Sequence, residues 1–127
     1  MSQQEMTKRI IRAMQNPYVN IFCHPTGRLI GRRAGYQIDI DEIIKAAKKY
    51  GVALEIDSFP DRLDLQDVYI RKAVSAGVKL VIDSDAHDTT HLEFIKFGIG
   101  QARRGWARKS DILNTKSVDE LLKRLKR

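Results

Sequence analysis

The chain has 127 residues, a formal net charge of +7 and 31% charged residues, which describes a basic chain with the length of one domain. No apolar run approaches the ~18 residues that a membrane span needs, and the first residues lack the apolar core of a signal peptide. The single Cys cannot form an internal disulfide, so a reducing cytoplasm is the expected location.

The first half of the chain predicts a strand, a basic loop and a helix, in that order. The apolar residues at 19–23 predict the strand, and the arginine-rich sequence at 27–33 predicts a loop. Asp39 or Asp41 can cap the helix that follows. This helix is expected to end at Gly51, because glycine adopts the left-handed conformation after a helix without strain.

The second half continues the alternation of strands and helices. Apolar segments predict strands at 52–56 and 78–82, and the helix between them is expected to begin at Asp64 and end at Gly77. A further helix is predicted from about residue 90 to residue 104. The last predicted helix begins at Ser117, which forms a capping box with Glu120.

An internal repeat with an offset of 26 residues supports this order of elements. The sequence AKKYGVALEIDS at 47–58 matches AVSAGVKLVIDS at 73–84. Each unit contains a helix end, a glycine, an apolar strand and Asp-Ser. Apolar strands separated by helices indicate a parallel sheet covered on both faces, with right-handed crossovers. The predicted fold class is therefore α/β, with a βαβαβ unit from a doubly wound sheet or from a barrel that three strands cannot close.

Polar residues follow all three predicted strands, at the sheet edge where parallel α/β folds bind their ligands. His24 follows the first strand and Asp57 the second, whereas Asp83, Asp85 and His87 follow the third. His and Asp are ordinary ligands of Zn²⁺, Mn²⁺ and Fe. Each of these residues is also compatible with a plain turn, so it is their shared edge that indicates a metal site.

Three nearby residues have simpler interpretations. Cys23 at a strand end is expected to act as a small hydrophobic residue, and His91 is expected to cap or pack a helix. Arg28 in the basic loop can bind a phosphate through two parallel hydrogen bonds or lie in solvent.

The positive charge is concentrated at the two ends of the chain. Residues 1–36 carry a net charge of +5, residues 37–100 carry −4 and residues 101–127 carry +6. An acidic centre between phosphate-attracting surfaces has this distribution, and so do two basic terminal helices without any site.

Four segments together resemble the C-terminal part of the PHP (polymerase and histidinol phosphatase) domain, in particular that of bacterial and archaeal family X DNA polymerases. The segments are HPTGRLIGRR (24–33), EIDSFPDRLDL (55–65), LVIDSDAH (80–87) and ARRGWARKSDILNT (102–115). The resemblance implies a distorted seven-stranded α/β barrel that holds several Zn²⁺, Mn²⁺ or Fe ions and hydrolyses phosphoesters. For family X polymerases it further implies 3′→5′ exonuclease activity, DNA-end processing in repair, and DNA as the partner.

The resemblance also implies roles for individual residues, of three kinds. The implied metal ligands are His24, Asp85 and His87. The implied phosphate contacts are Arg28 and Arg62. The residues implied to orient a ligand histidine are Asp57 and Asp83.

The family's early ligands, an N-terminal His-x-His motif and further His and Glu residues, are absent from these 127 residues, whose histidines are His24, His87 and His91. Residues 1–127 are therefore expected to form a single partial PHP domain, the C-terminal half of the barrel. Its expected partner is the N-terminal half or a second copy of the chain. Two functions stay open: part of a metal-dependent phosphoesterase, or a catalytically inactive fragment or basic nucleic-acid binding module.

Overall fold

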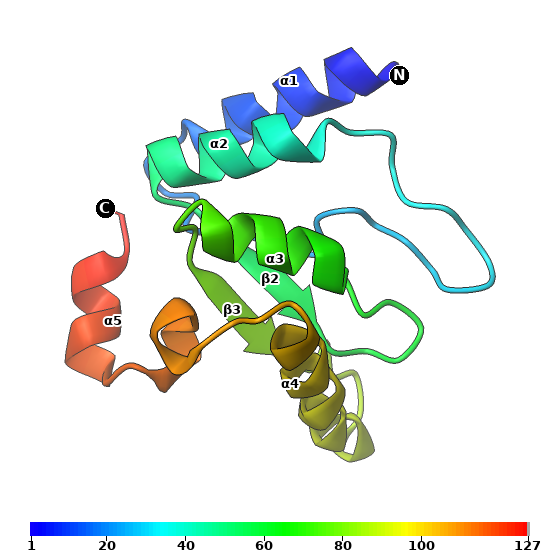
Figure 1. The fold of residues 1–127 in the computed structure, drawn as a ribbon, viewed down its shortest axis with the longest axis vertical. Coiled ribbons are helices and arrows are strands. Elements are labelled where there is room, and N and C mark those ends of the chain that lie inside the picture. The colour runs from blue at the N-terminus through cyan, green and yellow to red at the C-terminus, as the bar shows by residue number, and fades with distance from the viewer. Residues whose placement is uncertain (127) are drawn as a thin grey trace.

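The computed structural model describes residues 1–126, which form a three-stranded parallel sheet and five α-helices (Figure 1). The strands, in spatial order, are β1 (Ile21–Phe22), β2 (Ala53–Asp57) and β3 (Leu80–Asp83). The helices are α1 (Gln3–Met14), α2 (Ile40–Tyr50), α3 (Asp67–Ser75), α4 (Ile95–Arg104) and α5 (Val118–Arg124). The predicted α/β class is confirmed. No described helix combines the length and the apolar character needed to cross a membrane.

The internal repeat corresponds to the pairing register of the sheet. Equivalent positions of the two repeat units lie side by side on β2 and β3, as in the pairs Leu54–Leu80 and Asp57–Asp83. Because side chains alternate along a strand, each such pair projects to the same face of the sheet. The repeat therefore places its two Asp residues next to each other at the carboxyl ends of neighbouring strands.

One face of the sheet carries the main hydrophobic core. Leu54 and Ile56 of β2 and Leu80 of β3 are fully buried, and they pack with apolar residues of α2, α3 and α4. Figure 1 shows α2 and α3 stacked over the strands, with α1 beyond α2. Burying these aliphatic side chains stabilises the fold by roughly 1.5–3 kcal/mol for each residue.

The opposite face of the sheet changes in character from the beginning of the strands to their ends. At the beginning of β2 and β3, Ala53 and Val81 pack with Leu113 and with Leu121 of α5. Further along, the same face carries Glu55, Asp57 and Asp83, so it becomes acidic toward the strand ends. This face is therefore apolar where the strands begin and acidic where they end, and Glu55 and Asp57 are buried there.

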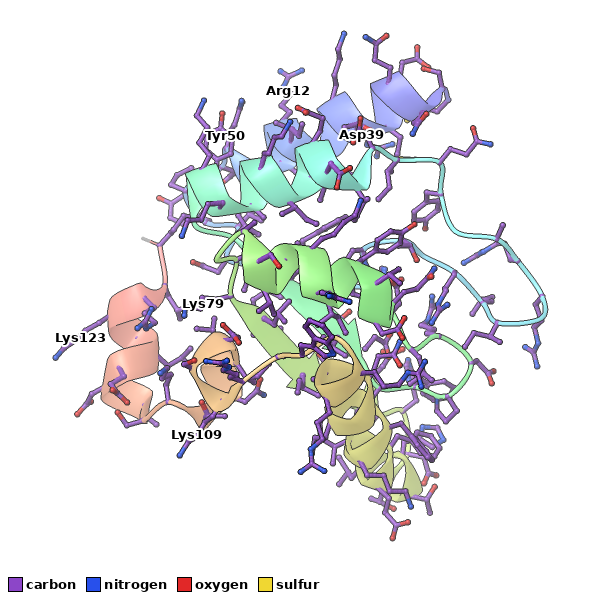
Figure 2. The ribbon with its side chains drawn as sticks, in the orientation of Figure 1. Arg12, Asp39, Tyr50, Lys79, Lys109 and Lys123 are labelled. Carbon is purple, nitrogen blue, oxygen red and sulfur yellow. The ribbon has the colours of Figure 1, made fainter. Side chains whose placement is uncertain are left out.

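Most of the predicted helix boundaries are confirmed. The Asp39 side chain caps α2 by accepting the Asp41 and Glu42 N–H groups, and its position beside α1 is visible in Figure 2. Ser117 and Glu120 form the predicted capping box. Both glycines expected after a helix have positive φ angles, 66° at Gly51 and 75° at Gly77.

Three expectations about the elements are wrong. The cap of α3 is Gln66, because the carboxylate of Asp64 binds a different part of the chain. The single helix predicted over 90–104 is divided into a 3₁₀ helix, η1 (Thr89–Phe94), and α4. The first strand contains two residues rather than five, and Cys23 beyond it is exposed rather than buried.

The outer edge of β3 is protected by the segment that follows α4. This segment contains the 3₁₀ helices η2 (Lys109–Asp111) and η3 (Leu113–Thr115), and Ile112 between them forms a parallel bridge with Leu80. Asn114 Oδ1 accepts the Ile82 N–H at 2.8 Å, and Asn114 Nδ2 donates to the Ile82 carbonyl at 2.8 Å. The Asn114 amide thus replaces a neighbouring strand.

Replacing Asn114 by alanine should lower the free energy of unfolding by about 2 kcal/mol, because it leaves both backbone groups of the buried Ile82 without a partner. Urea denaturation measures the loss, and the amide exchange rate of Ile82 should rise. Asn16→Ala is the matched control, because Asn16 accepts one hydrogen bond in an exposed turn. Equal losses for the two variants would contradict the role given to Asn114.

Candidate metal-binding edge

The loops beyond the three strands bring the predicted site residues to one edge of the sheet. His24 lies two residues after β1, Asp57 and Asp83 end β2 and β3, and Asp85 and His87 follow β3. His24 and Asp85 have positive φ angles of 32° and 51°, a region that residues other than glycine rarely adopt. Strained backbone of this kind is concentrated at functional sites.

A cluster of carboxylates lies at the end of the acidic face. Glu55 is 5% exposed, and burial, followed by its hydrogen bond to Asp83, raises the pKa of its carboxyl to about 8. Burial, with a further contribution from the Asp85 and Asp83 charges, raises the pKa of Asp57 to about 6. Asp57 Oδ2 and Asp83 Oδ1 are buried without a hydrogen-bond partner among residues 1–126. The cluster therefore holds more carboxylates than its hydrogen-bond donors satisfy.

Glu55 was not among the residues that the sequence singled out. Its carboxylate accepts the His24 N–H, so it joins the end of β2 to the loop beyond β1. The same carboxylate helps burial to raise the pKa of the Cys23 thiol to about 12, although Cys23 as a whole reaches solvent. A charged residue inside an apolar strand, two positions before Asp57 and hence on the same face, is the signal that could have identified Glu55.

Arg62 provides the nearest positive charge. Its Nε atom lies 3.7 Å from Asp57 Oδ2 and 3.7 Å from Asp85 Oδ2. The Arg62 side chain is 25% exposed, so it is only partly buried between them. Arg62 was predicted to contact phosphate, and the structure places it between two carboxylates of the edge.

Arg28, the other predicted phosphate contact, connects two loops. Its Nε donates to the Arg62 carbonyl at 2.8 Å and its Nη2 donates to the Leu63 carbonyl at 2.6 Å. These bonds hold the loop after β1 against the loop after β2, and they set the position of the Arg62 backbone. Arg28 thereby contributes to the metal-binding edge indirectly, by holding the backbone of Arg62 in place.

Asp64 fixes the loop that contains His24. Its buried carboxylate accepts the Thr26 N–H at 3.1 Å, the Thr26 hydroxyl at 2.9 Å and the Gly27 N–H at 2.8 Å. The Asp64 backbone exchanges hydrogen bonds with Asp57, so the carboxylate is anchored to the end of β2. Sequence reasoning missed this role, because the donors are 37 and 38 residues away in the chain.

His87 is oriented by its neighbours. Its Nδ1 lies 2.6 Å from the Asp85 carbonyl, which can only accept, so Nδ1 donates and the lone pair of the neutral imidazole is on Nε2. The His87 N–H donates to His91 Nδ1 at 3.1 Å. His91 itself packs between Phe59 and Phe94, with ring centroids 5.2 and 5.1 Å away. The expectation that His91 is a packing residue agrees with this position.

The donors at this edge fit a divalent cation in charge and in chemistry, but not in number. Carboxylate oxygens without partners, and a histidine whose Nε2 is available, are groups that bind Zn²⁺ or Mn²⁺. In residues 1–126, however, no group of three or more His, Cys, Asp or Glu side chains converges closely enough to hold a metal ion. The predicted ligands His24, Asp85 and His87 therefore share an edge without forming a closed coordination sphere.

Sequence comparisons relate the chain to larger proteins. It is 48% identical, over 120 residues, to the DNA polymerase/3′-5′ exonuclease PolX of Bacillus subtilis, and the match covers 94% of this chain and 21% of PolX. It is 32% identical, over 129 residues, to a probable phosphatase of Thermoanaerobacter sp. strain X514, covering 95% of this chain and 50% of that protein. A probable phosphatase of Caldanaerobacter subterraneus is 36% identical over 87 residues, which are 64% of this chain and 32% of that protein. No protein-family profile matches.

Proposed function

We propose that this chain, which is related to the C-terminal part of the PHP domain, forms part of a metal-dependent phosphoesterase of the PHP type. The observation that carries the proposal is the acidic strand edge, where Asp57 and Asp83 each have a buried carboxylate oxygen without a hydrogen-bond partner among residues 1–126. The homology to PolX and to probable phosphatases supports the hydrolase family. The chain spans half or less of each of these relatives, so the activity of a whole protein is part of the proposal.

His24, Asp85 and His87 are the residues that would hold Zn²⁺, Mn²⁺ or Fe at this edge. When bound, such ions activate water and neutralise charge on a phosphate. The role of the protein residues is to hold the donors in place. The Asp85 carbonyl orients the ring of His87, and Asp57 lies close enough to Asp85 that, besides burial, the charge of Asp85 raises the Asp57 pKa. Arg62 lies beside Asp85, where it can contact a substrate phosphate.

We place the remaining ligands on a further segment, either of a longer chain or of a second copy. In residues 1–126, β1 pairs with β2 alone, so its other edge can receive another strand. Ile21 on this strand is 40% exposed, and Cys23 beyond it is also exposed. A strand added parallel to β1 at this edge would bring its carboxyl end next to His24.

The substrate that we propose is a DNA end, processed in the 3′→5′ direction as part of repair. The name of the PolX relative supports this choice, and so does the basic charge of residues 1–36 and 101–127. A basic surface on both sides of an acidic centre attracts the nucleic-acid backbone while the centre holds cations.

One observation favours a second candidate, a basic nucleic-acid binding module without catalysis. It is the lack, within residues 1–126, of three converging ligands. In that case the carboxylate cluster would be a structural remnant, and binding to DNA would depend on salt but not on metal.

The two candidates are separated by hydrolysis of a 3′-labelled single-stranded oligonucleotide, with and without Mn²⁺, by the chain in a form that includes the remaining ligands, either the longer chain or the self-associated copy. The phosphoesterase predicts Mn²⁺-dependent release of nucleotides, and His87→Ala should lower the rate by at least about 100-fold, because a metal ligand is lost. Asp85→Ala should have a similar effect. Its matched control is Asp119→Ala, an exposed carboxylate on α5, which should retain the full rate. Binding without any Mn²⁺-dependent release would favour the non-catalytic module.

A further inference from the structure

Trp106 is exposed at a place where nothing in the fold requires a tryptophan. It follows α4 directly, and 63% of its surface is accessible to solvent. An α-helix of 10 residues is roughly 15 Å long, and α4 begins near His91 and ends before Trp106. Trp106 therefore lies beyond the carboxyl end of α4, whereas His87 and His91 precede the helix.

The backbone at Trp106 is strained. Its φ angle is 63°, the left-handed conformation that glycine normally provides after a helix. The neighbouring Gly105 cannot change places with it, because a Cβ atom there would overlap Ile70 of α3. The chain thus accepts a strained backbone and an exposed apolar ring at the same residue, and gains no buried packing from the ring.

A guanidinium group orients the indole. The Arg71 guanidinium carbon of α3 lies 3.4 Å from the centroid of the Trp106 ring, in a stacked cation–π contact. Since this contact covers one face of a ring that is 63% exposed, the other face is open to solvent. Trp106 and Arg71 also line a hollow of about 330 Å³, together with Val74, Ser75 and Arg108.

The surroundings of the ring are basic. Arg104 is paired with Asp67 at 3.1 Å, whereas Arg103 and Arg108 form no ion pair with other residues of 1–126. Lys109 extends from the same segment into solvent (Figure 2). The one carboxylate that lines the hollow, Asp111, accepts the Arg108 N–H at 2.7 Å. The surface therefore combines an open aromatic face with an excess of positive charge.

We propose that Trp106 and its arginines form a binding surface for single-stranded nucleic acid, separate from the metal-binding edge. A base would stack on the open face of Trp106, opposite Arg71, while Arg103 and Arg108 contact the flanking phosphates. Every nucleotide carries both a planar base and a phosphate, whereas an acidic peptide offers a planar ring only where it contains an aromatic residue. The surface requires neither a metal nor catalysis, so it stands whether or not the chain hydrolyses phosphoesters.

The chain contains a single tryptophan, so its fluorescence reports directly on this surface. Titration with an oligothymidylate in EDTA should quench the emission, because a stacked base contacts the indole. Heparin, a polyanion without bases, should bind at low salt without comparable quenching. Equal quenching by heparin and oligothymidylate, or a response to phosphatidylserine vesicles alone, would overturn the proposal.

Variants separate binding from stability. Trp106→Gly relieves the strained φ angle, so it should leave the melting temperature within a few degrees of the original. Its affinity for a labelled oligothymidylate should fall by about 10-fold, since one base–aromatic stack is lost. Tyr18→Ala is the matched control, because Tyr18 is an aromatic residue that is 80% exposed on another part of the chain. Unchanged affinity in Trp106→Gly, or an equal loss in Tyr18→Ala, would refute the stacking role.

Discussion

Replacing Gly98 by alanine should lower the free energy of unfolding by about 2–3 kcal/mol. Gly98 is buried in α4, where the helix contacts the sheet. A Cβ atom at this position would overlap Ser58 Oγ and lie 2.7 Å from Ile82 Cγ2. Since both neighbours belong to the core, α4 would have to move outward. Urea denaturation measures the effect.

The control for this variant lies on the same helix. A Cβ atom at Gly100 would meet nothing within 4 Å, so Gly100→Ala should stabilise the chain by about 0.5–1 kcal/mol through helix propensity alone. Opposite signs for the two variants are the expected result. If Gly98→Ala were as harmless as Gly100→Ala, the close contact between α4 and the sheet would be wrong.

Replacing Asp64 by alanine should cost about 3 kcal/mol, because it removes a charged acceptor from three buried donors. The donors are the Thr26 and Gly27 N–H groups and the Thr26 hydroxyl. The loop that carries His24 would lose its anchor, so amide exchange over residues 24–36 should accelerate beyond the global change in stability. Urea denaturation and hydrogen exchange measure the two effects.

Asp61→Ala is the matched control for Asp64→Ala. The Asp61 carboxylate lies on the same loop, but its contact is an exposed ion pair with Arg32 at 3.9 Å. Pairs of this kind contribute about 0.5 kcal/mol or less. Comparable losses for the two variants would show that Asp64 does not hold the loop in the way described.

The sheet could be predicted because its determinants are local and repeated. The glycines at 51 and 77 end two helices, and the apolar segments after them form β2 and β3. The 26-residue offset of the repeat also predicts the pairing register of β2 and β3, because equivalent residues such as Ile56 and Ile82 are paired across the strands. Predictions of this type depend on neighbouring residues alone, which the sequence displays directly.

The interactions that position the site could not be predicted in the same way. Asp64 looked like a helix cap, but its carboxylate binds donors that lie 37 and 38 residues earlier in the chain. Arg28 was expected either to bind a phosphate or to lie in solvent, but it donates to carbonyl groups 34 and 35 residues away. Side chains of Asp and Arg have many possible partners, and only the folded backbone selects among them.

The length and the burial of the first strand were overestimated for a related reason. Its apolar residues at 19–23 have the composition of a buried strand, yet β1 contains two residues and Ile21 is 40% exposed. Burial of a strand depends on neighbours on both edges and both faces, and in residues 1–126 β1 has one strand neighbour. Composition indicates what a strand can bury, and the rest of the fold decides how much of it is buried.

We have proposed that the carboxylate and histidine edge of the sheet belongs to a metal centre. Calorimetric titration of Mn²⁺ into the chain, compared with the double variant Asp85→Ala/His87→Ala, tests it most directly. Since residues 1–126 hold only part of the ligand set, we expect weak but saturable binding, which is lost in the double variant and retained in the Asp119→Ala control. An absence of saturable binding in the original chain, or equal binding in the double variant, would contradict it.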